Sequence, residues 1–191
     1  VDEIVVPELE GKRHGKKITD LIQRGQHILV QAVKDPMKTK GARLSMELTV
    51  AGRYMVYAPT GEGIGVSKRL DDRERERLRK EVKGLDMGGG GAIVRTAAQG
   101  AKRADFEREL MYLHKLYEVL GQRAEKAVAP ALVFQEADLS VRVVRDIFSA
   151  DFEKAIIDDP QQHHRLSSFF TRTGPELAER LDLWEDKTES L

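Results

Sequence analysis

Apolar and polar residues alternate strictly between Arg43 and Val50. A period of two is the pattern of a half-buried β-strand, so one side of this segment is predicted to face a core. Residues 27–33 and 54–58 are apolar and β-favouring and are also predicted strands, while residues 18–23 favour a short helix. The alternating residues form two sets: Leu44, Met46, Leu48 and Val50 on the inner side, and Ser45, Glu47 and Thr49 on the outer side.

Two segments carry helical spacing instead. Residues 104–128 place apolar side chains three and four positions apart, which predicts a long helix with one buried face. Residues 71–83 are dense in charge and predict a surface helix, supported by pairs such as Glu76 and Lys80 at a spacing of four. The buried face of the long helix is expected to comprise Phe106, Leu110, Leu113, Tyr117, Leu120 and Ala124.

The pattern changes again after Pro130, which marks a predicted subdomain boundary. Residues 131–134 and 139–144 are predicted strands, joined by a hairpin turn at residues 137–138. Residues 152–157 are expected to run from a helix into a further strand. The carboxyl-terminal part of the chain is therefore expected to mix short strands with helices.

Two helix starts follow in the same region. Asp159 precedes Pro160, which is the order of an N-cap and a proline at the first helical position. Thr173 and Glu176 have the spacing of a capping box. Leu181 and Leu183 alternate with a polar residue toward Trp184.

A glycine run at residues 88–91 precedes a short apolar stretch, 92–94, that predicts a buried strand. Arg95 and Thr96 follow where this strand should end. A guanidinium beside a hydroxyl at the end of a strand can bind an anion, because the arginine offers a planar fork of donors and the threonine adds another. The alternative is an arginine that reaches solvent or pairs with a carboxylate distant in the sequence.

Composition narrows the class of protein. The chain has 191 residues, of which 40% are hydrophobic, so it can build one large core or two small ones. It has no cysteine, which excludes disulfides, zinc thiolates and cysteine nucleophiles and fits a cytoplasmic protein. No apolar run is long enough to span a membrane, and no signal peptide is visible.

The net charge is zero, but its distribution is uneven. Basic residues dominate segment 12–43, which holds nine of them against two acidic ones, while segment 129–191 holds thirteen acidic and seven basic residues. A polyanion is therefore expected to bind the amino-terminal half, although clustered lysines on a solvated surface are also common.

No convincing catalytic centre or metal site is predicted from the residues. The glycines of Gly61-x-Gly63-x-Gly65 could cradle a phosphate, but they lack a following lysine and serine, so a plain turn is the better interpretation. Asp158 and Asp159 could meet Glu136 or Asp146 and hold magnesium, but Asp159 is already expected to cap a helix. The five histidines show no zinc-protease spacing.

Several short motifs, taken in order, resemble the ribonuclease E/G family. They are Lys40-Gly-Ala-Arg-Leu44, Gly52-Arg-Tyr-Met-Val56, Val66-Ser-Lys-Arg69, Val94-Arg-Thr-Ala97, Ala129-Pro-Ala-Leu132 with Gln135-Glu136, Val143-Val-Arg-Asp146 and Ile156-Ile-Asp-Asp-Pro160. The likeness extends over nearly the whole chain. It implies an α+β fold, a mixed-sheet chain of several subdomains.

By this resemblance, residues 1–50 correspond to part of an OB-fold RNA-binding domain, residues 51–128 to an α/β domain that senses the 5′-monophosphate end of RNA, and residues 129–191 to part of an RNase H-like subdomain. The resemblance also assigns the candidate site residues. They are Arg95 and Thr96 for the terminal phosphate, Gly52 and Val56 for the first nucleotide, Lys68 where some members have arginine, and Lys38, Lys40, Arg43 and Arg69 for the RNA chain.

The family further implies a single-strand-specific endoribonuclease of RNA processing and decay. Its parent protein would use Mg²⁺, in some members also Zn²⁺, would form homo-oligomers and could have RNA-decay protein partners. The ligands of both metals are expected outside this chain, so the chain alone is expected not to cut RNA. The alternatives are a stand-alone, non-catalytic module that binds single-stranded RNA, and a structural adaptor whose acidic carboxyl-terminal part docks a protein.

Overall fold

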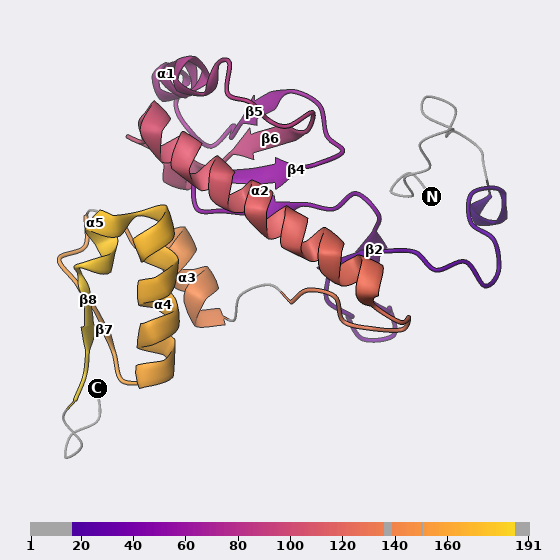
Figure 1. The fold of residues 1–191 in the computed structure, drawn as a ribbon. Coiled ribbons are helices and arrows are strands. Elements are labelled where there is room, and N and C mark those ends of the chain that lie inside the picture. Colours follow the sequence, from indigo (N-terminus) through magenta and orange to yellow (C-terminus); the bar gives the residue numbers. More distant parts are fainter. Residues whose placement is uncertain (1–16, 136–138, 150, 186–191) are drawn as a thin grey trace.

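A computed structural model describes residues 17–135, 139–149 and 151–185. The fold is α+β: a mixed sheet crossed by a long helix, a separate hairpin, and a carboxyl-terminal unit of helices with two short strands (Figure 1). This agrees with the predicted fold class. The predicted domain boundaries, and the assignment of the first segment to a partial OB-fold, stay predictions.

The central sheet has four strands in the order β3-β4-β6-β5. The β3–β4 and β4–β6 pairs are antiparallel, whereas β5 and β6 run parallel. Ile93 lies opposite Val56 on one side and opposite Gly65 on the other. The strands are β3 (Val50–Ala51), β4 (Met55–Ala58), β5 (Ile64–Val66) and β6 (Gly91–Val94).

Two helices accompany this sheet, and both were predicted. Helix α1 (Asp72–Val82) begins after Asp71, whose carboxylate accepts a hydrogen bond from the Glu74 N–H at 2.9 Å. Helix α2 (Arg103–Lys126) lies across one face of the sheet (Figure 1). Its buried residues include Phe106, Leu110, Leu113 and Leu120, as the helical spacing predicts.

The core between α2 and the sheet takes every second residue of each strand. Ala92 and Val94 are buried in it, but Ile93 between them is 58% exposed. The strand predicted at residues 92–94 is therefore confirmed, but it is buried on one face only. The other residues of this core are Val50, Tyr54, Met55, Tyr57, Leu70, Leu78, Val82, Met87, Ala98, Ala101, Phe106, Leu110 and Leu113.

The amino-terminal part of the described chain is a short 3₁₀ helix, η2 (Ile18–Asp20), followed by a hairpin of β1 (Gln31–Lys34) and β2 (Arg43–Ser45). The single strand predicted from Arg43 to Val50 is split, because the Gln31 side chain bonds both the N–H and the carbonyl of Thr49, at 2.9 and 3.1 Å. The predicted facing is also wrong at β2, where Leu44 is exposed and Ser45 is buried.

The carboxyl-terminal unit has its own core and a parallel pair of strands, β7 and β8. Its core residues are Val141, Phe148, Leu166, Phe170, Leu177 and Leu181. Its elements are α3 (Leu139–Ile147), β7 (Ala155–Ile157), α4 (Pro160–Thr173), α5 (Pro175–Ala178) and β8 (Leu181–Leu183).

Two strand predictions in this unit were wrong. Residues 139–144 form α3, because Val141, Arg145 and Phe148 recur at helical spacing and are all buried. Residues 131–134 form no strand. The turn predicted at residues 137–138 lies outside the described residues.

The two predicted helix starts had different outcomes. The Asp159 carboxylate caps α4 by accepting from the N–H groups of Gln161 and Gln162, at 2.7 and 3.1 Å, with Pro160 at the first helical position. The capping box predicted at Thr173 was wrong. Its hydroxyl instead donates back to the Phe169 carbonyl within α4, at 3.0 Å, because the helix continues through this residue.

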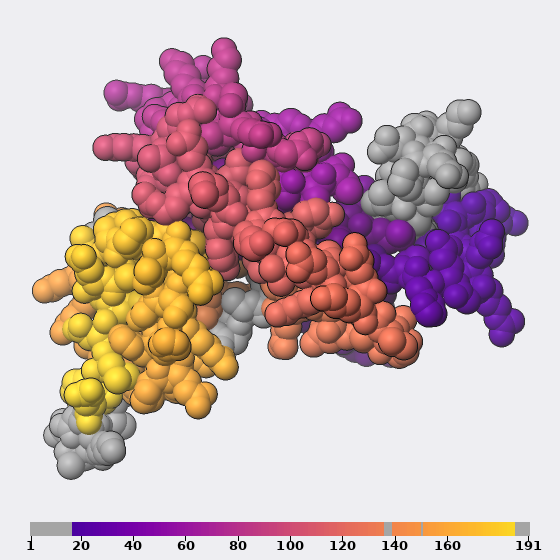
Figure 2. Space-filling model, in the orientation of Figure 1, coloured from indigo at the N-terminus to yellow at the C-terminus, as the bar shows by residue number. Residues whose placement is uncertain are grey.

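The carboxyl-terminal unit packs against α2 (Figure 2). Tyr112 of α2 meets Phe169 of α4 edge to face, with ring centroids 6.4 Å apart. The Arg53 guanidinium lies 5.3 Å from the Tyr54 ring centroid and 5.5 Å from that of Phe170. Side chains of the sheet and of the carboxyl-terminal unit are therefore in direct contact.

Candidate functional site

Arg95 lies at the end of β6, where it is the N-cap of a short 3₁₀ helix, η3 (Thr96–Ala98). Its backbone N–H donates to the Tyr54 carbonyl at 2.7 Å, which keeps it beside the β3–β4 turn. Its guanidinium Nη1 donates to the Gly52 carbonyl at 2.6 Å. Two predicted site residues, Arg95 and Gly52, are therefore in direct contact.

The other end of the Arg95 fork meets a carboxylate. Nη2 lies 2.7 Å from Oδ1 of Asp146, which comes from α3. The pairing with a distant carboxylate, left open by the sequence, is thus present. N–H groups of Arg95 remain available for a ligand. A guanidinium has five N–H groups, and the described contacts of Arg95 engage two of them.

Asp146 is shared between two arginines. Its Oδ1 also lies 2.9 Å from Nε of the buried Arg145, whose Nη1 is 3.4 Å from the Ala51 carbonyl. Burial raises the pKa of the Asp146 carboxyl, but the hydrogen bond and charge of Arg145 and the charge of Arg95 outweigh it, so the pKa falls below its usual value. Asp146 is therefore an anion at neutral pH.

Glu109 of α2 supports the β3–β4 turn from inside. It is fully buried, and its carboxylate accepts from the backbone N–H groups of Arg53, Tyr54 and Met55 at 2.6 to 3.1 Å. Burial raises its pKa to about 7, against the lowering effect of these hydrogen bonds and of Arg95. The turn that presents the Gly52 carbonyl is thus fixed by a side chain of α2.

Gly52 is required by this packing. A Cβ built on Gly52 would lie 2.6 Å from Cδ of Glu109, which no ordinary side chain tolerates. The sequence suggested a glycine that lets a nucleotide approach the backbone. In the structure the Glu109 carboxylate lies closest to the position that a Cβ of this residue would take.

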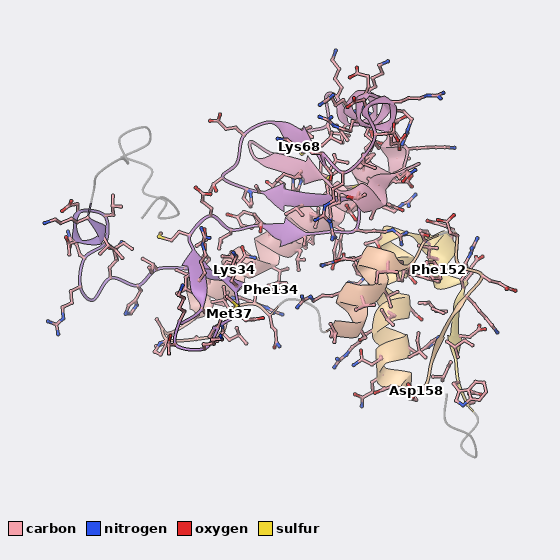
Figure 3. All side chains as sticks on the ribbon, turned by 180° about the vertical axis from the view of Figure 1, so that it is seen from behind. Lys34, Met37, Lys68, Phe134, Phe152 and Asp158 are labelled. Carbon is pink, nitrogen blue, oxygen red and sulfur yellow. The ribbon has the colours of Figure 1, made fainter. Side chains whose placement is uncertain are left out.

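A pair of hydroxyls adjoins Arg95. Oγ1 of the exposed Thr96 lies 3.3 Å from Oγ of Ser67, which follows β5. The Ser67 N–H donates to the Val94 carbonyl at 2.9 Å and so ties this loop to β6. Lys68 and Arg69 come next and are exposed, with Lys68 at the edge of the sheet in Figure 3.

Val56 lies on the side of the sheet opposite the core. It is half-buried and pairs with Ala51 on β3 and with the exposed Ile93 on β6. Gly65 on β5 completes this row across the four strands. The row is apolar and adds no hydrogen-bonding side chain to the site.

The other predicted cations occupy the β1–β2 hairpin. Met37 and Lys40 exchange two backbone hydrogen bonds of 2.9 Å across its turn, and Lys38 between them has a left-handed φ of 51°. Lys38, Lys40 and Arg43 are exposed. Figure 3 shows the hairpin, marked by Lys34 and Met37, well apart from Lys68, so the predicted residues form two separate basic regions.

No group of three histidine, aspartate or glutamate side chains that could hold a metal ion occurs within the described ranges. Asp158 follows β7, Asp159 caps α4, and Asp146 is engaged by two arginines. Glu136, the remaining member considered, lies outside the described residues. Among the described residues, no helix has the length and apolar character needed to cross a membrane.

The glycines at 61–65 form a turn that leads into a strand. Gly61 closes a turn with a 2.9 Å bond from its N–H to the Ala58 carbonyl, and the Gly63 carbonyl accepts from the Ala92 N–H at 3.0 Å. Gly65 is already part of β5. A plain turn was the preferred interpretation of this motif. The turn is confirmed at Gly61, whereas the strand that includes Gly65 was not predicted.

Sequence analysis missed Glu109, Ser67 and the role of Asp146. Glu109 could have been noticed, because it interrupts the apolar stripe of the long helix between Phe106 and Leu110. Asp146 was considered only as a candidate magnesium ligand, and its pairing with Arg95 joins segments that are distant in the sequence. Nothing in the sequence singles out Ser67 except its position in the motif Val66-Ser-Lys-Arg69.

The sequence is similar to that of known ribonucleases. The model of the Ribonuclease E/G family matches residues 49–191. Ribonuclease G of Escherichia coli is 33% identical over 181 residues, which are 94% of this chain and 37% of that protein. Ribonuclease E of a Nostoc species is 36% identical over 159 residues, which are 83% of this chain and 23% of that protein. The chain thus spans about a third of such relatives or less.

Proposed function

Because the chain belongs to the ribonuclease E/G family, we propose that it is the part of such an endoribonuclease that binds single-stranded RNA and senses its 5′-monophosphate end. The observation that best supports the proposal is that two contacts fix the position of the Arg95 guanidinium. Gly52 and Asp146 fix it at the end of β6, while further N–H groups of the same fork face no described acceptor.

A terminal phosphate suits these donors. A phosphomonoester carries about −1.5 to −2 charges at neutral pH and offers three acceptor oxygens, which the planar guanidinium fork binds in a bidentate manner. The Thr96 and Ser67 hydroxyls, 3.3 Å apart, are proposed to supply neutral donors. Lys68 adds a charge at the rim, although an ammonium lacks the fork of an arginine. A 5′-hydroxyl end would use none of these charge-assisted bonds.

The rest of the RNA is proposed to lie along the basic hairpin. Lys38, Lys40 and Arg43 are exposed there, and flexible cations of this kind neutralise phosphates without reading sequence. Arg69, next to Lys68, is proposed to contact the chain nearer its end. Binding by this surface should weaken strongly with salt, whatever group the RNA carries at its 5′ end.

Cleavage belongs to the whole enzyme in this proposal. The residues described here offer no metal site, so the Mg²⁺ implied by the family, and the Zn²⁺ of some members, would be held elsewhere in the complete protein. The chain by itself is proposed not to cut RNA. We further propose that the parent enzyme works in the cytoplasm as a homo-oligomer, with other RNA-decay proteins as possible partners.

The competing function is a stand-alone module that binds single-stranded RNA without sensing its end. The basic hairpin alone would suffice for it. Such a module would bind RNA with a 5′-monophosphate and RNA with a 5′-hydroxyl equally, so the two functions separate in one measurement.

The test is fluorescence anisotropy with one short single-stranded RNA in two forms, 5′-monophosphate and 5′-hydroxyl. The wild-type chain should bind the phosphorylated form more tightly, and Arg95→Ala should remove the difference. Loss of a charged hydrogen-bonded contact costs roughly 1.5–3 kcal/mol, which is about tenfold or more in Kd. Arg79→Ala, which removes an exposed arginine of α1 paired with Glu76, is the control and should change neither Kd. Equal binding of both RNAs by the wild-type chain would contradict the proposal.

A further inference from the structure

We infer that Asp146 is the positioning residue of the phosphate sensor: it holds the Arg95 fork in the orientation that receives the 5′-phosphate. The inference rests on the function proposed above and goes beyond it. It assigns a role in end recognition to α3, an element of the carboxyl-terminal unit that lies outside the central sheet.

The geometry is a closed ring of contacts. Arg95 reaches the Gly52 carbonyl at 2.6 Å and Asp146 at 2.7 Å, Asp146 reaches Arg145 at 2.9 Å, and Arg145 reaches the Ala51 carbonyl at 3.4 Å. Ala51 and Gly52 are neighbours in the chain, so the carbonyls of two consecutive peptide units receive the two arginines. The carboxylate of Asp146 is the bridge between them.

This ring matters because an arginine side chain has many rotamers to lose. A half-exposed arginine that orders only on binding would give up part of its binding free energy in that step. The Gly52 carbonyl fixes one terminal nitrogen, and a single contact leaves the fork free to turn about it. Asp146 fixes the second terminal nitrogen, and two contacts define the plane of the guanidinium.

The charge of Asp146 is the obvious objection, since it would repel a phosphate. The structure supplies the compensation: Arg145 shares the same carboxylate oxygen, so the three groups together carry a net charge of +1. The Arg145 side chain is 7% exposed, which keeps this second cation within the protein rather than in reach of the ligand. Orientation, not repulsion, is therefore the effect that we assign to Asp146.

The test measures the ratio of the Kd for 5′-hydroxyl RNA to the Kd for 5′-monophosphate RNA. Asp146→Ala should lower this ratio about three- to tenfold, the value of immobilising one long side chain. Asp146→Asn keeps an oxygen that can accept from Arg95 and should give a ratio between those of wild type and Asp146→Ala. In the Arg95→Ala background, Asp146→Ala should change nothing further.

Asp182→Ala is the matched control. Asp182 is an exposed carboxylate of the same unit that pairs with Lys154 at 3.1 Å, and its loss should leave the ratio unchanged. Binding of 5′-hydroxyl RNA and the thermal midpoint report whether each variant is folded. If Asp146→Ala does not fold, the Asp146→Asn ratio decides, and a value at or above that of wild type overturns the inference.

A ratio that rises in both Asp146 variants would also overturn it, because the carboxylate would then act as a competitor for Arg95. The outcomes separate the inference from the proposed function. If Arg95→Ala leaves the ratio unchanged, the phosphate sensor itself is wrong. If Arg95→Ala abolishes the preference and Asp146→Ala does not reduce it, only the role of Asp146 is wrong.

Discussion

The buried carboxylate of Glu109 lies against the α-carbon of Gly52, so close that a Cβ there would stand 2.6 Å from Cδ of Glu109. The same carboxylate accepts from the backbone N–H groups of the three residues that follow Gly52. Helix α2 thereby shapes the turn whose carbonyl holds Arg95. The arginine that we propose to bind the phosphate thus depends on a buried residue of another element.

Gly52→Ala should destabilise the chain, because the added methyl group forces the Glu109 carboxylate or the turn to move. Overpacking of this kind costs about 1–3 kcal/mol, which urea unfolding would detect. Gly121→Ala is the control. Gly121 lies inside α2 with nothing within 4 Å of its Cβ position, so alanine there should stabilise the chain by about 0.5–1 kcal/mol. A Gly52→Ala chain as stable as wild type would contradict the packing described here.

Glu109 should make stability depend on pH near neutrality. Its pKa is about 7 in the folded chain and 4.5 for an ordinary glutamate, so the folded state holds the proton more tightly than the unfolded state. The stabilisation of the folded chain by protonated Glu109 is complete below pH 4.5. It is lost as pH rises from 4.5 to about 7. The loss cannot exceed about 1.4 kcal/mol per pH unit, the limit for a single proton.

Glu109→Gln removes this titration. Unfolding free energies measured between pH 5 and pH 7 should fall with pH in the wild-type chain and fall less in Glu109→Gln. The same slope in both chains would show that another group titrates. Asp105→Asn, at the first turn of the same helix, should leave the slope as in wild type.

Arg95→Lys should keep the positive charge of the site and still lose much of the end preference. An ammonium cannot reach the Gly52 carbonyl, Asp146 and a phosphate with a planar fork. We expect a ratio of Kd values between those of wild type and Arg95→Ala, with the thermal midpoint close to wild type. A ratio equal to that of wild type would mean that charge alone recognises the phosphate.

The hairpin lysines should determine how strongly RNA binding depends on salt, and should not affect the preference for a 5′-monophosphate end. Each phosphate contact on a single strand contributes about 0.7 to the slope of log K against log salt. Replacing Lys38 and Lys40 together by alanine should therefore reduce the slope by about 1.4, equally for both RNAs. Lys80→Ala on α1 should leave it unchanged. A selective loss for phosphorylated RNA would place the hairpin at the sensor instead.

Much of the central sheet and its helices was predictable, because the signal is local. The stripe from Phe106 to Leu120 fixes α2, and the short apolar run before Arg95 fixes β6. The register of the sheet, with Val56 opposite Ile93, depends on pairing between distant segments and had no local signal. The helix α3 was mistaken for a strand, because its polar residues Ser140 and Arg142 alternate with apolar ones over its first five positions.

The candidate site was predictable only in part. Arg95 and Thr96 could be singled out by their position after a strand and by the family motif. Their partners could not, since Asp146 comes from a different core and Ser67 from the loop after β5. Ion pairs between distant segments do not affect the local periodicity of a sequence. The position of Asp146 between Arg95 and Arg145 could therefore be found only from the structure.

The most direct test of the account is the coupling between the 5′-phosphate and Arg95. It requires four Kd values at one salt concentration: wild type and Arg95→Ala, each with 5′-monophosphate and 5′-hydroxyl RNA. We predict that removing the phosphate and removing the guanidinium are strongly non-additive, with a coupling of at least about 1.4 kcal/mol, or tenfold. Additive effects would mean that Arg95 does not meet the phosphate, and the sensor would have to lie elsewhere.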